Sequence, residues 1–334
     1  MLLRLAQVLE QLDLALEHLS KGDANNARFG LMLTDNALEL SLHRLAQEES
    51  QRHRRYNWMK SETYPHRRAL EAALGQDFSP KLKFAELSGR LTEEEAGTIR
   101  ICHLFRNETY HVGVRHEEIL PEVSRFYFKV ACDVLERLSP LGLGWSSGQK
   151  IPERAKKYFA EREKGGVPAK FGDYEAACRQ MAEQAGHDPA SLAETLANHM
   201  ANVINDVDVA LDFISEEAPQ RTTRDQAVID TQAWPIAFSD EGKAYVAKNG
   251  PSPISMLAAV EWVAKHYRLQ FRSDPVPGWQ KRADKLQQER NPHRALNQYR
   301  SFMDQSRQFR DGLDEAARAL DNEIENQIQA ARGN

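Results

Sequence analysis

The sequence predicts an all-α protein with two helical domains, and three observations lead to this prediction. Apolar residues recur at three- and four-residue spacing along most of the chain, as expected for helices that bury one face. Residues that cap or break helices separate these segments. The chain has 334 residues, of which 41 % are hydrophobic, and this length exceeds what one helical core usually fills.

Residues 1–140 are expected to form a helical domain, and the sequence contains no internal repeat. Gly22 ends the first helix, and a second helix is expected from about Ala24 to Glu49. The run from Thr92 to Glu95 matches a capping box, which predicts a helix that continues to about Val112. Pro121 begins a closing helix that ends near Leu138. The first helix has an apolar face formed by Leu5, Val8, Leu9, Leu12, Leu16 and Leu19.

The second half of the chain is expected to be mainly helical and joined by a glycine-rich connection at residues 141–170. Four helix breakers near its start, Pro140, Gly142, Gly144 and Gly148, indicate the joint. Residues 171–334 then form a second domain, and the stretch 217–251 holds either a small hairpin or a long connection. Helices are expected at about 152–163, 172–186, 189–216, 252–268, 278–290 and 293–331.

The last of these helices carries a long apolar stripe. Such spacing suits a helical hairpin or a coiled-coil face that self-associates. The stripe consists of Phe302, Phe309, Leu313, Ala316, Leu320, Ile324 and Ile328.

Composition excludes several classes of protein. The formal net charge of −5 argues against a polycation that coats nucleic acid, so any contact with phosphate must come from local basic patches. Cys102, Cys132 and Cys178 have no metal-binding or disulfide spacing, and we expect all three to be buried in a protein of the reducing cytoplasm. Charged residues interrupt the apolar N-terminus, so neither a signal peptide nor a membrane span is expected.

The helix expected at residues 93–112 has one unusual polar face. At about 100° per residue, Ile101, Phe105 and Val112 fall together on the core side, with Thr109 beside them. A solvated helix face usually carries Lys, Glu and Gln, whereas the opposite face here is typical of a partly enclosed polar cleft. In angular order it consists of Arg106, Tyr110, His103, Asn107 and His111.

These residue types suit the cleavage of RNA without a metal ion. The 2′-hydroxyl attacks the neighbouring phosphorus when a base removes its proton and an acid protonates the leaving oxygen. Histidine suits both steps because it titrates near neutral pH. Arginine offers a planar, permanently charged donor to the phosphorane oxygens. No cluster of residues suggests a metal site or a cofactor, and Asp206, Asp208 and Asp212 are interpreted as a solvated acidic face.

The run Arg106-Asn107-Glu108-Thr109-Tyr110-His111 resembles the signature of the HEPN superfamily, an Arg followed by four to six residues and then His. The two long N-terminal helices and the closing helix also resemble this family. The resemblance covers residues 1–140 and implies an endoribonuclease in which Arg106 and His111 are catalytic and Asn107 supports them. It further implies a homodimer or higher oligomer with a composite cleft, and an antitoxin or a phage-derived trigger as partner, as in toxin and anti-phage systems.

Alternatives remain open for each of these residues. His111 could be stabilised by the helix dipole and Arg106 by an acidic partner, with no catalytic role. Asn107 could be an ordinary polar position. Asp35 and Glu39 on the second helix could support the motif or belong to a surface stripe, while His103 and Tyr110 could be packing residues. The corresponding alternatives for the protein are a non-catalytic HEPN-like module that binds RNA, nucleotide or protein, and a scaffold that oligomerises through residues 293–331.

A basic stretch at residues 51–70 is a candidate RNA-docking surface. We expect it to be short and irregular, with Pro65 opening another small helix. Tyr56 and Trp58 are interleaved with its cations, a combination that suits phosphate contact together with base stacking. The cations proposed to bind RNA are Arg52, Arg54, Arg55, Arg67 and Arg68.

Overall fold

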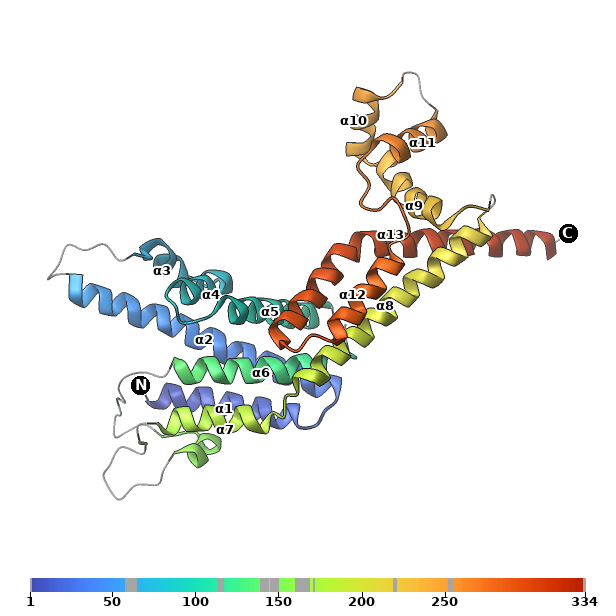
Figure 1. Cartoon of the computed structure of the whole chain (residues 1–334). Helices are drawn as coiled ribbons and strands as arrows, with labels where there is room; N and C mark the ends of the chain where they lie inside the picture. Colours follow the sequence, from blue (N-terminus) through green and yellow to red (C-terminus); the bar gives the residue numbers. More distant parts are fainter. Residues whose placement is uncertain are drawn as a thin grey trace. The chain divides into compact units, whose positions relative to one another are not determined.

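The prediction of an all-α fold is confirmed, because all regular structure in the described part of the chain is helical (Figure 1). The computed structural model describes residues 2–57, 65–112, 117–138, 144, 150–159, 169–170, 172–218, 221–251 and 255–332, without the side chains of 55–57 and 110–112. The chain divides into two compact units. The first comprises residues 1–196 and 289–297, and the second comprises residues 197–288 and 298–334.

The first unit contains four helices that lie side by side, α1 (Leu2–Leu19), α2 (Ala24–Asn57), α6 (Leu120–Arg137) and α7 (Asp173–Gln184) (Figure 1). The apolar face expected for α1 is largely buried, as Leu5, Leu9, Leu12 and Leu19 are almost inaccessible to solvent. Because α7 packs against α1 and α6, this unit extends well past residue 140. Most of the glycine-rich joint expected at 141–170, namely residues 141–143, 145–149 and 160–168, lies outside the described residues.

The first unit contains three further helices, one of which carries the polar face described above. They are α3 (Arg67–Ala73), α4 (Phe78–Leu87) and α5 (Glu93–Val112), and both α4 and α5 contact α2. The capping box of α5 forms as expected, since the Glu95 backbone N–H donates to Thr92 Oγ1 at 3.2 Å and the Thr92 N–H donates to Glu95 Oε2 at 2.9 Å. The helix expected at 152–163 is instead the short 3₁₀ helix η1 (Glu153–Tyr158).

A further expectation about local structure in this unit is wrong, and one helix was not predicted. Residues 51–57 are not irregular, because α2 continues through them to Asn57. No proline or glycine interrupts this basic run, and an ion pair one turn apart, Arg52 Nη1 to Glu49 Oε1 at 3.1 Å, supports the helix. Helix α4 was not expected at all, although Asp77 at its N-cap position and Pro80 in its first turn are typical of a helix start.

The second unit contains the long part of α8 (Pro189–Glu217), α12 (Val276–Gln287) and most of α13 (Pro292–Arg332). Aromatic rings join α12 to α13, since Trp279 contacts Phe302 and Phe309 edge-on with ring centroids 5.3 and 6.1 Å apart. The predicted stripe of α13 is therefore buried in its first half, through Leu313. Farther along the helix the exposure rises, and Ile328 is 44 % exposed.

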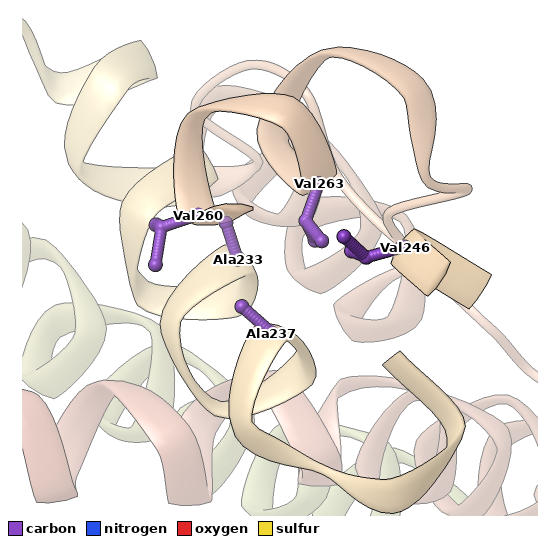
Figure 2. Packing of buried hydrophobic residues seen from close by; sticks show 5 residues of the cluster. All are labelled: Ala233, Ala237, Val246, Val260 and Val263. Carbon is purple, nitrogen blue, oxygen red and sulfur yellow. The ribbon is translucent and has the colours of Figure 1, made fainter. Parts of the chain in front are cut away.

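Residues 217–251 form neither a hairpin nor a long connection, which corrects the sequence-based expectation. They contain the whole of α9 (Arg224–Phe238) and of α10 (Asp240–Asn249), which pack with α11 (Met256–His266). Figure 2 shows the small side chains Ala233, Ala237, Val246, Val260 and Val263 gathered between these three helices. The sequence signal for these helices is weak because Pro235 lies within α9 and their core contains few large apolar residues.

None of the helices in the described ranges has the length and apolar character needed to cross a membrane. All three cysteines are free and buried, as expected.

The turn between α9 and α10 yields a prediction about stability. A Cβ atom on Gly242 would lie 1.8 Å from the carbonyl oxygen of Ile236, a backbone atom that cannot move aside. We expect Gly242→Ala to destabilise the group α9–α11 by about 2–3 kcal/mol, because the helix pair must separate. Hydrogen exchange of the α9–α11 amides measures this effect.

Gly278 offers a matched control, because it is also the third residue of its helix and no atom lies within 4 Å of the position of its Cβ. In Gly278→Ala, hydrogen exchange of the backbone amides should be unchanged or slower, since alanine has a higher helix propensity than glycine. Equal protection of α9–α11 in Gly242→Ala and in the wild type would contradict the predicted clash.

A second prediction concerns His187, which is partly buried against Phe126 with ring centroids 4.9 Å apart. Burial lowers the pKa of His187 from 6.5 to about 4, and Lys129 and His293 nearby act in the same direction, whereas Asp188 opposes them. The unfolded chain therefore binds a proton at a higher pH than the folded chain does. The stabilising contribution of the neutral ring is complete above pH 6.5 and is lost as the pH falls towards about 4.

We expect His187→Leu to weaken the decline of the free energy of unfolding between pH 6.5 and 4, measured by urea unfolding at each pH. His266→Leu is the control, because His266 is exposed on α11. Parallel declines in His187→Leu and the wild type would show that the ring does not titrate as described.

Candidate functional site

The motif helix α5 is oriented by its apolar side. Ile101, Phe105 and Thr109 are 8 %, 1 % and 0 % exposed, so the predicted core side is buried. The side chain of Val112 lies outside the described residues, as do those of Tyr110 and His111. On the polar side, the described side chains are those of His103, Arg106 and Asn107. His103 and Arg106 belong to successive turns of the helix.

Asp35 of α2 forms the centre of the site, although its side chain is completely buried. His103 Nδ1 lies 2.9 Å from Asp35 Oδ2, and the Tyr127 hydroxyl of α6 donates to Asp35 Oδ1 at 2.7 Å. A carboxylate only accepts hydrogen bonds, so His103 Nδ1 donates this bond. Three helices therefore meet at one carboxylate, and a surface stripe does not describe Asp35.

Arg106 is held on two sides. Its Nε lies 3.6 Å from Asp35 Oδ2, the oxygen that also contacts His103. Its Nη1 donates to the side-chain oxygen of Asn107 at 2.8 Å, while its backbone carbonyl accepts a bond from Thr109 Oγ1 at 3.0 Å. The Arg106 side chain is 33 % exposed, so the guanidinium is accessible from solvent as well as positioned.

Helix α4 contributes two residues that sequence reasoning missed. The Phe78 ring stacks on the His103 ring with centroids 3.8 Å apart and planes inclined by 7°. One turn later, the buried Lys81 Nζ donates to Glu39 Oε1 at 2.8 Å and to the Gln76 carbonyl at 2.6 Å. Glu39 thus fixes α4 to α2, and α4 in turn supports the ring of His103.

The electrostatics of the site keep two neutral groups near Asp35, the Tyr127 hydroxyl and the Cys102 thiol, in their protonated forms. Burial, together with the negative charge of Asp35, raises the pKa of Tyr127 well above its usual value. The same two causes raise the pKa of the Cys102 thiol. Tyr127 therefore acts as a permanent hydrogen-bond donor to Asp35, and Cys102 is a buried neutral thiol.

The predicted RNA-binding arginines whose side chains the structure describes lie on α2 and α3. Arg52 pairs with Glu49, and Arg67 Nε pairs with Glu71 Oε1 at 2.8 Å. Arg54 and Arg68 are exposed. The side chains of Arg55 and Tyr56, together with residues 58–64, lie outside the described residues.

Two residues of the acidic face of α8, Asp208 and Asp212, form ion pairs within the second unit. Arg224 donates to both Asp208 and Asp212, and its Nε contacts Asp274 Oδ2 at 2.9 Å. Burial would lower the pKa of Arg224, but these carboxylates raise it above its usual value. In the described ranges, no group of three or more His, Cys, Asp and Glu side chains is placed to hold a metal ion.

Comparison of the chain with protein-family models, curated proteins and solved structures finds no match. The resemblance to the HEPN superfamily therefore depends on the motif and the arrangement of helices alone.

The cluster around Asp35 predicts a large effect of truncation. Asp35→Ala removes the acceptor of the buried Tyr127 hydroxyl and of His103, and it leaves Arg106 without its nearby carboxylate. We expect a loss of about 3 kcal/mol in the free energy of unfolding, measured by urea denaturation. Glu48→Ala on the same helix removes a partly exposed ion pair with Arg44 and should cost less than about 0.5 kcal/mol. Similar losses in the two variants would contradict the central role of Asp35.

Proposed function

We propose that the protein is an endoribonuclease of the HEPN type that cleaves RNA without a metal ion. The observation that carries the proposal is that one buried carboxylate oxygen of Asp35 lies 2.9 Å from His103 Nδ1 and 3.6 Å from Arg106 Nε. This arrangement holds an imidazole and a guanidinium in position on one side of α5, the helix whose sequence carries the Arg106–His111 motif. A proton-transferring group beside a fixed cation is what phosphodiester cleavage requires.

In the proposed reaction, the 2′-hydroxyl of the RNA attacks the adjacent phosphorus. His111 acts as general acid–base, and Arg106 stabilises the charge that develops on the phosphorane oxygens. Asn107 supports Arg106 by accepting a hydrogen bond from its Nη1. The products are a 2′,3′-cyclic phosphate and a 5′-hydroxyl end.

The biological setting that goes with this proposal is a cytoplasmic toxin or anti-phage effector. Two protomers would combine their motifs in one cleft, so the active species would be at least a homodimer. An antitoxin or a phage-derived trigger would control it, and the exposed Arg54 and Arg68 would contribute to RNA contact.

We expect the purified protein to cleave RNA in the presence of EDTA. Arg106→Ala and His111→Ala should each reduce the rate constant at least about 100-fold, because each removes a group that acts in the transition state. The measurement is single-turnover cleavage of labelled RNA, with end-group analysis for the cyclic phosphate. Arg100→Ala provides the control, since Arg100 is an exposed arginine of the same helix.

Absence of cleavage by the wild type, or equal rates in the wild type and His111→Ala, would overturn the proposal. Binding of RNA without cleavage, insensitive to His111→Ala, would instead identify a HEPN-like binding module. Sedimentation provides a further check, because a protein that is monomeric with and without RNA cannot form a composite site.

A further inference from the structure

His103 has the surroundings of a reacting group rather than those of a packing residue. We propose that His103 is the general base of the RNA cleavage and that Asp35 and Tyr127 are its positioning residues. This inference rests on the proposed function and extends it, because the superfamily motif begins only at Arg106. It divides the two proton transfers between two histidines of α5, with His103 as the base and His111 as the acid.

The contact with Asp35 selects the tautomer that a base needs. Since the Asp35 carboxylate accepts from Nδ1 at 2.9 Å, the proton of the neutral ring resides on Nδ1. The lone pair is then on Nε2, at the opposite edge of the imidazole. Asp35 itself is fixed by the Tyr127 hydroxyl at 2.7 Å, which burial keeps protonated. A buried carboxylate behind the imidazole also stabilises the imidazolium that forms when Nε2 takes a proton.

The ring plane of His103 is fixed by a second, independent contact. Phe78 stacks on it almost in parallel, at 3.8 Å between centroids and 7° between planes. The Lys81–Glu39 pair holds α4, and therefore Phe78, against α2. Even so, the His103 side chain remains 17 % exposed, so the ring is held by α2 and α4 without being sealed in the core.

The position relative to Arg106 completes the geometric argument. Residues three apart on a helix lie side by side, with Cβ atoms about 5–6 Å apart. Arg106 Nε and His103 Nδ1 also contact the same oxygen of Asp35. In the proposal, the ribose next to a phosphate bound by the Arg106 guanidinium therefore lies at the neighbouring His103 imidazole.

The proton balance of the proposed step is complete. His103 Nε2 takes the proton of the 2′-hydroxyl as the bond between O2′ and phosphorus forms. The bond between phosphorus and O5′ breaks, and the imidazolium of His111 donates its proton to the leaving O5′. Exchange with water then returns both histidines to their starting protonation states.

The test uses His103→Asn, because the asparagine amide can still donate to Asp35 but cannot take a proton. We expect the cleavage rate to fall at least about 100-fold and the acidic limb of the pH–rate profile to disappear. The melting temperature should stay close to that of the wild type. Affinity for an uncleavable RNA with a 2′-deoxy sugar at the cleavage position should change less than about twofold. His266→Asn, an exposed histidine of the second unit, is the matched control and should cleave as the wild type does.

A substrate with a 5′-bridging sulfur distinguishes base from acid, because its leaving group needs no proton. This substrate should restore much of the rate to His111→Ala and none of it to His103→Asn. If His103→Asn is too unstable to assay, His103→Ala with added imidazole replaces it, and a rate that rises with imidazole supports the role as base.

The possible outcomes separate the two proposals. If His103→Asn keeps the wild-type cleavage rate and pH profile while His111→Ala is inactive, the role of His103 is overturned and the ribonuclease proposal stands. The role of His103 is equally overturned if the sulfur substrate restores the cleavage rate of His103→Asn. It is also overturned if imidazole does not raise the cleavage rate of His103→Ala. Absence of cleavage by the wild type overturns both.

Discussion

The first unit is organised around a carboxylate that has no exposed surface. Tyr127, His103 and Arg106 offset part of the free-energy cost of removing the Asp35 carboxylate from water. Each of these partners lies on α5 or α6, so the carboxylate joins both helices to α2. The same contacts that satisfy its charge also fix the positions of an imidazole and a guanidinium. Stability of the bundle and preparation of the site are therefore consequences of one arrangement.

Helix α4, a short segment, also supports the site around Asp35. The ion pair between Lys81 and Glu39 lies one turn of α2 beyond Asp35, and the stacked Phe78 lies one turn of α4 before Lys81. The site is thus held by residues from four helices, although the motif occupies only one. Orientation by surrounding side chains of this kind is what lets a histidine and an arginine act in fixed geometry.

Much of the fold could be predicted from local signals, whereas the site could not be predicted completely. The capping box at Thr92 and the apolar side of α5 defined the motif helix, and α1, α8 and α13 followed from periodicity. Helices α4 and α10 were missed because they are short, and α9 was missed because it contains Pro235 in its interior. The contact between Asp35 and His103 joins residues 68 positions apart, so no spacing rule reveals it. Tyr127 was missed for the same reason, since its bond to Asp35 spans 92 positions.

The central claim is that Asp35 holds His103 with the proton on Nδ1 and the lone pair on Nε2. The most direct measurement is the ¹⁵N spectrum of the histidine rings in the wild type and in Asp35→Asn, with His103→Asn used to assign the signals. The account predicts that neutral His103 is the Nδ1–H tautomer in the wild type and loses this preference in Asp35→Asn. An Nε2–H tautomer in the wild type, or an identical tautomer in both proteins, would contradict it.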